Sequence, residues 1–156
     1  MMHAEKAKEL FESGYNCAQA VTLAFADEMG MTKEEAARIS SSFGGGIGRL
    51  REVCGCVSGM ALVAGRLWGY ESPTANEEKA AHYKLIQELA EDFREANGSI
   101  ICRELLSGIT DDTKPVPEAR TDEYYKKRPC AAFIACAAGI LEKRIYEKTA
   151  PQNGEP

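Results

Sequence analysis

Residues 54–69, CGCVSGMALVAGRLWG, are apolar on nearly every side when wound as an α-helix. A helix of that kind is buried in its domain, so this stretch predicts a central helix around which the others pack. The run from Val53 to Trp68 carries Arg66 and is shorter than the roughly 18 apolar residues that a membrane span requires. Other helix backbones can approach this helix closely because small residues recur along it at helical spacing: Gly55, Ser58, Gly59 and Gly65.

The sequence of the remaining residues also indicates helices. It contains neither a two-residue hairpin signal nor an alternating apolar run long enough for a strand. Apolar residues three and four apart predict helices at about 3–29, 32–43, 74–96, 99–106 and 122–148, the last interrupted at Pro129. We expect Gly30 to end the first of these, a capping box of Thr32 and Glu35 to begin the second, and Ser99 to cap the short one.

Together these elements predict an all-α fold, a single-domain bundle of about five to six helices around a buried Gly/Cys-rich central helix. The domain covers residues 1–150, with a long surface loop at about 107–121 that contains two prolines and several acids. Residues 151–156 are expected to form a disordered tail. A chain of 156 residues can bury a sizeable core, so it needs neither disulfides nor a metal merely to fold.

The net charge and the N-terminal sequence argue against nucleic-acid binding and against secretion. The net charge is −5, from 19 basic and 24 acidic residues, which argues against a nucleic-acid surface built on bulk positive charge. The first ten residues, MMHAEKAKEL, lack the apolar core of a signal peptide. We therefore expect a cytoplasmic protein with no nucleic-acid partner and no membrane span.

Six cysteines are the unusual feature of the composition, at positions 17, 54, 56, 102, 130 and 136. Structural disulfides are rare in a reducing compartment, so a cysteine-rich cytosolic domain indicates metal binding or redox chemistry. No Cys-x-x-Cys is present, so both a zinc ribbon and a thioredoxin-type active site lack their signature.

Three of the cysteines are predicted to lie at helix starts: Cys54, Cys102 and Cys130. Free N–H groups and the helix dipole favour negative charge there, which lowers the pKa of a thiol and stabilises the thiolate that ligates a metal or attacks a disulfide. Cys17 is predicted to lie in mid-helix on the inward apolar stripe. If it is aimed at the three helix starts, it completes a four-thiolate site; alternatively, it is a small hydrophobic residue of the core.

The other two cysteines have weaker claims to a site. Cys136 lies about 120° around the helix from Cys130, which favours a role in core packing. Cys56 lies about 200° around a helix from Cys54, so the two share a ligand only if Cys54 precedes the helix proper.

A glycine-rich loop at 44–49, GGGIGR, precedes the central helix. It lacks the Gly-Lys-Ser/Thr ending of a phosphate loop and the strand that must precede one. It is either a flexible turn or a backbone that approaches a ligand or cluster closely, with Arg49 or Arg51 offsetting the negative charge. In the second case the candidate cofactor contacts are Gly45, Gly46, Gly55 and Cys56. His82, on the apolar stripe of 74–96, is expected to be a satisfied core or boundary residue.

Several of these motifs together resemble one known family. They are GYNCAQAV at 14–21, FGGGIGR at 43–49, VCGxxxG at 53–59, CRELL at 102–106, and Cys130 followed by AAGILE at 137–142. Over about residues 10–145 the chain is similar to the redox-active protein family named for its C_GCAxxG_C_C pattern. The resemblance implies a small helical, cytoplasmic, redox-linked protein whose signature cysteines are Cys17, Cys54, Cys102 and Cys130.

Similarity to the non-haem part of split-Soret cytochromes further implies an iron–sulfur cluster as the cargo. The chain departs from the family pattern in two places. Cys56 stands where alanine is expected, and Cys136 is also additional. A fifth or sixth ligand, or a disulfide partner, therefore stays open.

The leading hypothesis is that the four signature cysteines hold an iron–sulfur cluster, of the two-iron two-sulfur type, for electron transfer or sensing with a redox partner protein. A second is a cluster-free thiol–disulfide oxidoreductase, with Cys54 attacking and Cys102 or Cys130 resolving. A third is a binding module for a small thiol or a metal ion, zinc being the simplest, without turnover. The glycine-rich helix and the long loop could also serve a homodimer interface.

Overall fold

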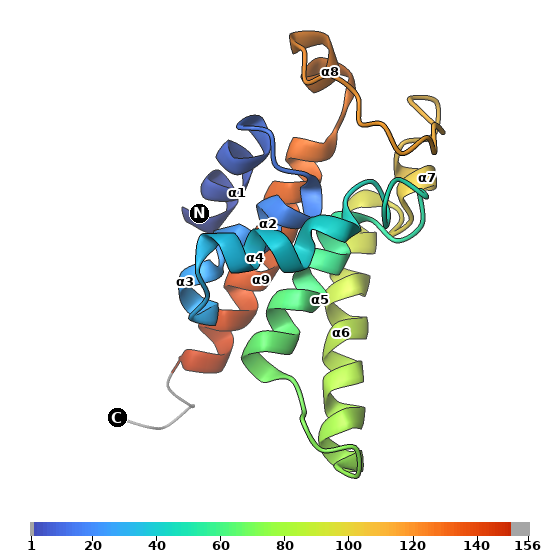
Figure 1. The fold of residues 1–156 in the computed structure, drawn as a ribbon. Coiled ribbons are helices and arrows are strands. Elements are labelled where there is room, and N and C mark those ends of the chain that lie inside the picture. The colour runs from blue at the N-terminus through green and yellow to red at the C-terminus, as the bar shows by residue number, and fades with distance from the viewer. Residues whose placement is uncertain (1, 151–156) are drawn as a thin grey trace.

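The computed structural model describes residues 2–150, which form an all-α single domain (Figure 1). Within this range there is no β-strand, and the only strand-like pairing is an isolated antiparallel bridge between Val53 and Ile101. The expected tail at 151–156 lies outside the described residues. The helices are α1 (Met2–Glu12), α2 (Cys17–Ala24), α3 (Ala26–Met29), α4 (Lys33–Ser40), the 3-10 helix η1 (Ser41–Phe43), α5 (Gly55–Trp68), α6 (Asn76–Asn97), α7 (Cys102–Leu105), α8 (Asp122–Lys127) and α9 (Cys130–Thr149).

The single helix expected at 3–29 is wrong, because the chain breaks twice in that range. Gly14 adopts φ +116°, which an L side chain rarely takes, and the chain turns there after α1. Asn16 then starts α2 through a capping box, in which its side chain accepts from the N–H of Gln19 and the Gln19 side chain accepts from the N–H of Asn16. A second break at Phe25, with φ −112° and ψ 17°, separates α2 from α3.

Other boundaries follow the sequence signals more closely. Gly30 ends α3 in the left-handed conformation, and the capping box of Thr32 and Glu35 begins α4. Pro129 separates α8 from α9. The Ser99 cap is wrong, because the Ser99 hydroxyl accepts from the N–H of Ile101 and the helix begins only after that residue. The described residues therefore form nine α-helices rather than five or six, chiefly because the expected first and last helices are divided.

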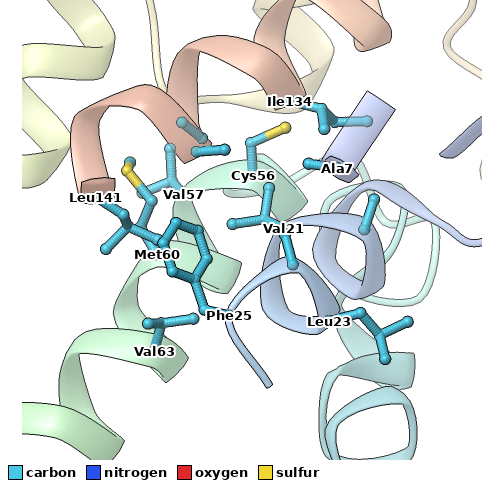
Figure 2. Close-up of a cluster of buried hydrophobic side chains, with 14 of the residues drawn as sticks. Ala7, Val21, Leu23, Phe25, Cys56, Val57, Met60, Val63, Ile134 and Leu141 are labelled. Atoms are coloured by element: carbon cyan, nitrogen blue, oxygen red, sulfur yellow. The ribbon is translucent and has the colours of Figure 1, made fainter. Parts of the chain in front are cut away.

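The core lies where α5 packs against α2, α6 and α9, while α1 covers the other side of α9 and α2. Figure 2 shows Met60 and Val63 of α5 packed with Val21 and Phe25 in this core. The close approach of α2 to α5 depends on Gly59, where a Cβ would lie 3.0 Å from the Val21 Cβ. The C-terminal half of α5 is not enclosed all round, because Gly65 and Arg66 are exposed.

The bundle brings the N-terminal ends of α2, α5, α7 and α9 to one region of the molecule (Figure 1). The segment 106–121, which has no helix, runs from α7 to α8 beside this region. None of the described helices combines the length and the apolar character that a membrane span requires.

Two glycines of α5 give a matched test of this packing. Gly59→Leu is expected to lower the free energy of unfolding by about 1–3 kcal/mol, because the new side chain must displace α2. Gly65→Ala is expected to raise it by up to about 1 kcal/mol, because no atom outside the local helix backbone lies within 4 Å of the added Cβ and alanine favours the helix. Urea denaturation measures both; an unchanged midpoint for Gly59→Leu would contradict the close packing of α2 on α5.

Candidate functional site

Five of the six cysteines line one cavity of about 370 Å³ near the helix starts. They are Cys17, Cys54, Cys56, Cys102 and Cys130, and every one is a free thiol. Cys136 does not line this cavity; its sulfur accepts a hydrogen bond from Asn97 Nδ2 at 3.5 Å and packs at the edge of the core. The structure thus brings the four cysteines of the predicted site together with Cys56.

The expected mid-helix position of Cys17 is wrong. Like the other three cysteines of the predicted site, Cys17 lies at the start of a helix. Cys17 is the first residue of α2, because Asn16 caps that helix. Cys54 is the N-cap residue of α5, and Cys102 and Cys130 are the first residues of α7 and α9. Since Cys54 precedes α5 proper, it and Cys56 can both face the cavity.

The bridge between Val53 and Ile101 brings together two cysteines that are far apart in sequence. The Cys54 N–H donates to the Ile100 carbonyl at 2.7 Å, and the Cys102 N–H donates to the Glu52 carbonyl at 2.6 Å. These bonds hold the start of α7 beside the start of α5.

The glycine-rich loop is strained and lies against the cysteines. Residues 45–49 all have positive φ, including Ile47 at +66° and Arg49 at +67°, and Arg51 has φ +62°. This conformation costs roughly 1–2 kcal/mol at each non-glycine residue, and strain of that kind is concentrated at functional sites. Of the two alternatives for this loop, the structure shows a strained backbone whose Gly46 passes close to Cys102.

At two positions near the cysteines, the space available requires glycine. A Cβ at Gly46 would lie 2.7 Å from the Cβ of Cys102. A Cβ at Gly55 would collide with the sulfur of Cys17. Gly45 has a different role, because its backbone N–H donates to the Cys17 sulfur.

The surroundings of Cys17 favour its thiolate. The Cys56 thiol donates a hydrogen bond to the Cys17 sulfur, and backbone N–H groups, including those of Gly45 and Ala18, donate as well. Together they lower the pKa of Cys17 from 9.0 to about 6, although burial opposes the change. Burial and the bond to Cys17 raise the pKa of Cys56 well above its usual range, so Cys56 remains a protonated donor.

The expectation that helix starts lower every thiol pKa is wrong for two cysteines. Burial raises the pKa of Cys130 to about 12, and the neighbouring sulfurs of Cys17 and Cys54 add to the rise. Burial also raises the pKa of Cys102, although the guanidinium of Arg51 opposes it. Withdrawal from water outweighs the favourable helix ends, so these thiols stay neutral beside the Cys17 thiolate.

Four arginines and one acid also line the cavity: Arg49, Arg51, Arg120, Arg128 and Glu118. Sequence patterns singled out Arg49 and Arg51 but missed the other three, which come from the segment before α9 and reach the cavity only through tertiary packing. Arg120 donates to the carbonyls of Phe11 and Tyr15, and Arg128 pairs with Glu118. No local spacing in the sequence marks these contacts.

The thiols surround a cavity and do not converge on a point. Among residues 2–150, no group of three or more His, Cys, Asp or Glu side chains is arranged to hold a single metal ion. His82 stands apart from the cavity, and its Nδ1 is buried without a hydrogen-bond partner, so the expectation of a satisfied histidine is wrong.

A family model described as "Putative redox-active protein (C_GCAxxG_C_C)" matches residues 15–144. The chain belongs to this family. Neither the curated proteins nor the solved structures that were compared give a match. The C_GCAxxG_C_C family supports a redox-active role for the cysteines and does not specify a cofactor.

The hydrogen bond from Cys56 can be tested through the reactivity of Cys17. The rate of Cys17 alkylation by iodoacetamide, followed by mass spectrometry, is expected to rise with pH through a midpoint near 6. In Cys56→Ala the donor is lost, so the midpoint is expected to move up toward the usual value of 9.0. Cys136→Ala, outside the cavity, is the matched control and is expected to leave the midpoint unchanged. A wild-type midpoint near the usual value would contradict the assigned environment.

Proposed function

We propose that this member of the C_GCAxxG_C_C family binds an iron–sulfur cluster through Cys17, Cys54, Cys102 and Cys130, for electron transfer or sensing. The observation that carries the proposal is that these four cysteines, each at the start of a different helix, line one cavity. Four cysteine thiolates are the usual ligands of two-iron and four-iron clusters. When bound, the cluster supplies a centre for one-electron transfer.

A cluster accepts a more widely spaced set of sulfur ligands than a single ion does. The five thiols lie around a cavity of about 370 Å³, and no three metal-ligating side chains among residues 2–150 are placed for one ion. A cluster spreads its ligand positions over several atoms, so it suits sulfurs placed around a volume. Zinc as the sole cargo is correspondingly less well supported.

The surrounding residues supply groups that stabilise negative charge on sulfur. The N–H of Gly45 donates to the Cys17 sulfur, and Arg51 Nη1 donates to the Cys102 sulfur at 3.8 Å. Bonds of this kind to ligating sulfurs tune the reduction potential. Cys102 and Cys130, whose pKa values are raised, each release a proton on becoming ligands, so binding is favoured as the pH rises.

A second candidate, a cluster-free thiol–disulfide oxidoreductase, is favoured by the contact between Cys17 and Cys56. The Cys17 thiolate would attack a substrate disulfide, releasing one thiol and forming a mixed disulfide. Cys56 would then lose its proton and attack the Cys17 sulfur, releasing the second thiol and leaving a Cys17–Cys56 disulfide. The lowered pKa makes Cys17, and not Cys54, the attacking residue in this scheme.

Anaerobic reconstitution with ferrous iron and sulfide is expected to produce a visible sulfur-to-iron charge-transfer absorbance. Cys→Ser changes at positions 17, 54, 102 and 130, made one at a time, are expected to abolish or greatly reduce it, because each removes one ligand. Cys136→Ser is the matched control and is expected to retain the full absorbance.

No charge-transfer absorbance in the wild-type chain would contradict cluster binding. If the same chain then gives a reversible Cys17–Cys56 disulfide with a mild oxidant, mapped by mass spectrometry after alkylation, the second candidate replaces the first.

A further inference from the structure

Two buried guanidinium nitrogens at the cavity have no hydrogen-bond partner: Nη2 of Arg49 and Nη2 of Arg51. Arg51 is only 3% exposed, and its other nitrogens are placed by Asp112 and Cys102. Its Nε donates to the Asp112 carbonyl at 2.9 Å, and its Nη1 lies 3.8 Å from the Cys102 sulfur. A buried cationic N–H without an acceptor is energetically unfavourable. An acceptor atom on a ligand bound in this cavity would remove that cost.

Arg49 is fixed in the same way. Its Nη1 donates to the carbonyls of Lys114 and Val116, in the segment that passes beside the cavity. Its Nη2 lies 3.6 Å from Asp112 Oδ2 and 3.8 Å from Glu118 Oε1, beyond hydrogen-bond distance for both. Each guanidinium is therefore held by its other nitrogens, and its Nη2 has no hydrogen-bond partner, although in Arg49 this nitrogen is within ion-pair distance of two carboxylates.

The charge of the cavity favours an anion. Its lining includes four arginines and one acid, Glu118, whereas the whole chain carries a net charge of −5. Glu118 is already paired with Arg128. Asp112 lies beside Arg49, and the Cys17 thiolate also faces the cavity. Together with Glu118 they bring three negative charges against the four arginines, so one positive charge remains in excess and favours an oxyanion.

Size and wall composition indicate an organic ligand. A volume of about 370 Å³ lies toward the lower end of the range for small-molecule sites. Apolar side chains complete the lining: Leu105, Leu106, Pro115, Pro117 and Phe133. An inorganic ion would leave these surfaces without a partner, whereas an apolar body beside a charged group would contact both.

We propose that the cavity binds a small organic oxyanion, a carboxylate or a phosphate ester, through the free Nη2 groups of Arg49 and Arg51. The apolar body of the ligand lies against the apolar part of the lining. Because Arg51 also contacts Cys102, the anionic group is held next to the cysteines. The evidence for this site is the two arginines and the cavity, so the proposal does not depend on whether the cysteines bind a cluster.

Isothermal titration calorimetry of the reduced, metal-free chain at low salt tests the site with three probes of similar shape. Benzoate and phenyl phosphate carry the two candidate head groups, and benzamide is the neutral control. At least one anion is expected to bind, with benzamide weaker by roughly tenfold or more, because it brings no charge to the guanidinium groups. The anion that binds more tightly identifies the head group.

Variants then assign the binding to the two arginines. Arg49→Gln and Arg51→Lys are each expected to weaken binding by roughly tenfold or more, because each removes a guanidinium donor. Arg94→Gln, on the exposed face of α6, is the matched control and is expected to bind as the wild type does. Circular dichroism verifies that each variant folds. If the buried Arg51→Lys variant does not fold, the affinity of Arg49→Gln alone tests the role of the arginines.

Three results would overturn the proposal: no binding of either anion at millimolar concentration, benzamide binding as tightly as benzoate, or unchanged affinity in Arg49→Gln. Iron reconstitution plays no part in this titration. Failure of the anion site and failure of the cluster are therefore separate outcomes.

Discussion

The contact between the first turns of α2 and α5 is the constraint on which the cysteine cavity depends. A Cβ at Gly55 would collide with the Cys17 sulfur and lie 2.9 Å from the Phe43 carbonyl oxygen, so only glycine allows the two helix starts to meet. Their meeting brings Cys17 within hydrogen-bond reach of Cys56. The glycine-rich loop must then turn sharply between η1 and α5, and it does so with left-handed backbone at consecutive residues.

Burial and charge act against each other in this cavity. Hydrogen bonds favour a thiolate at Cys17, whereas burial keeps Cys56, Cys102 and Cys130 protonated. Because only Cys17 among these four cysteines carries a negative charge, repulsion between their sulfurs is limited. In the proposed cluster, cationic iron would remove that limit by binding the sulfurs as thiolates, so ligation and proton release would be linked. The family's redox-active character is consistent with the grouping of five cysteines at one cavity.

The helical class, the capping box at Thr32 and the break at Pro129 could all be predicted, because each depends on residues close together in sequence. The grouping of the four cysteines was also predictable in outline, from helix starts and from the family motifs. The break at Gly14 was missed because apolar spacing continues across it, and so Cys17 was placed in mid-helix. The raised thiol pKa values, and the roles of Arg120 and Arg128, depend on burial and on contacts between distant segments, which no local pattern encodes.

The most direct test of the shared cavity is a crystal structure of the anaerobically reconstituted chain, with anomalous diffraction recorded at the iron absorption edge. The expected result is anomalous density inside the cavity, within bonding distance of the sulfurs of Cys17, Cys54, Cys102 and Cys130. Iron located elsewhere, or any of these four sulfurs facing a different part of the molecule, would contradict the account.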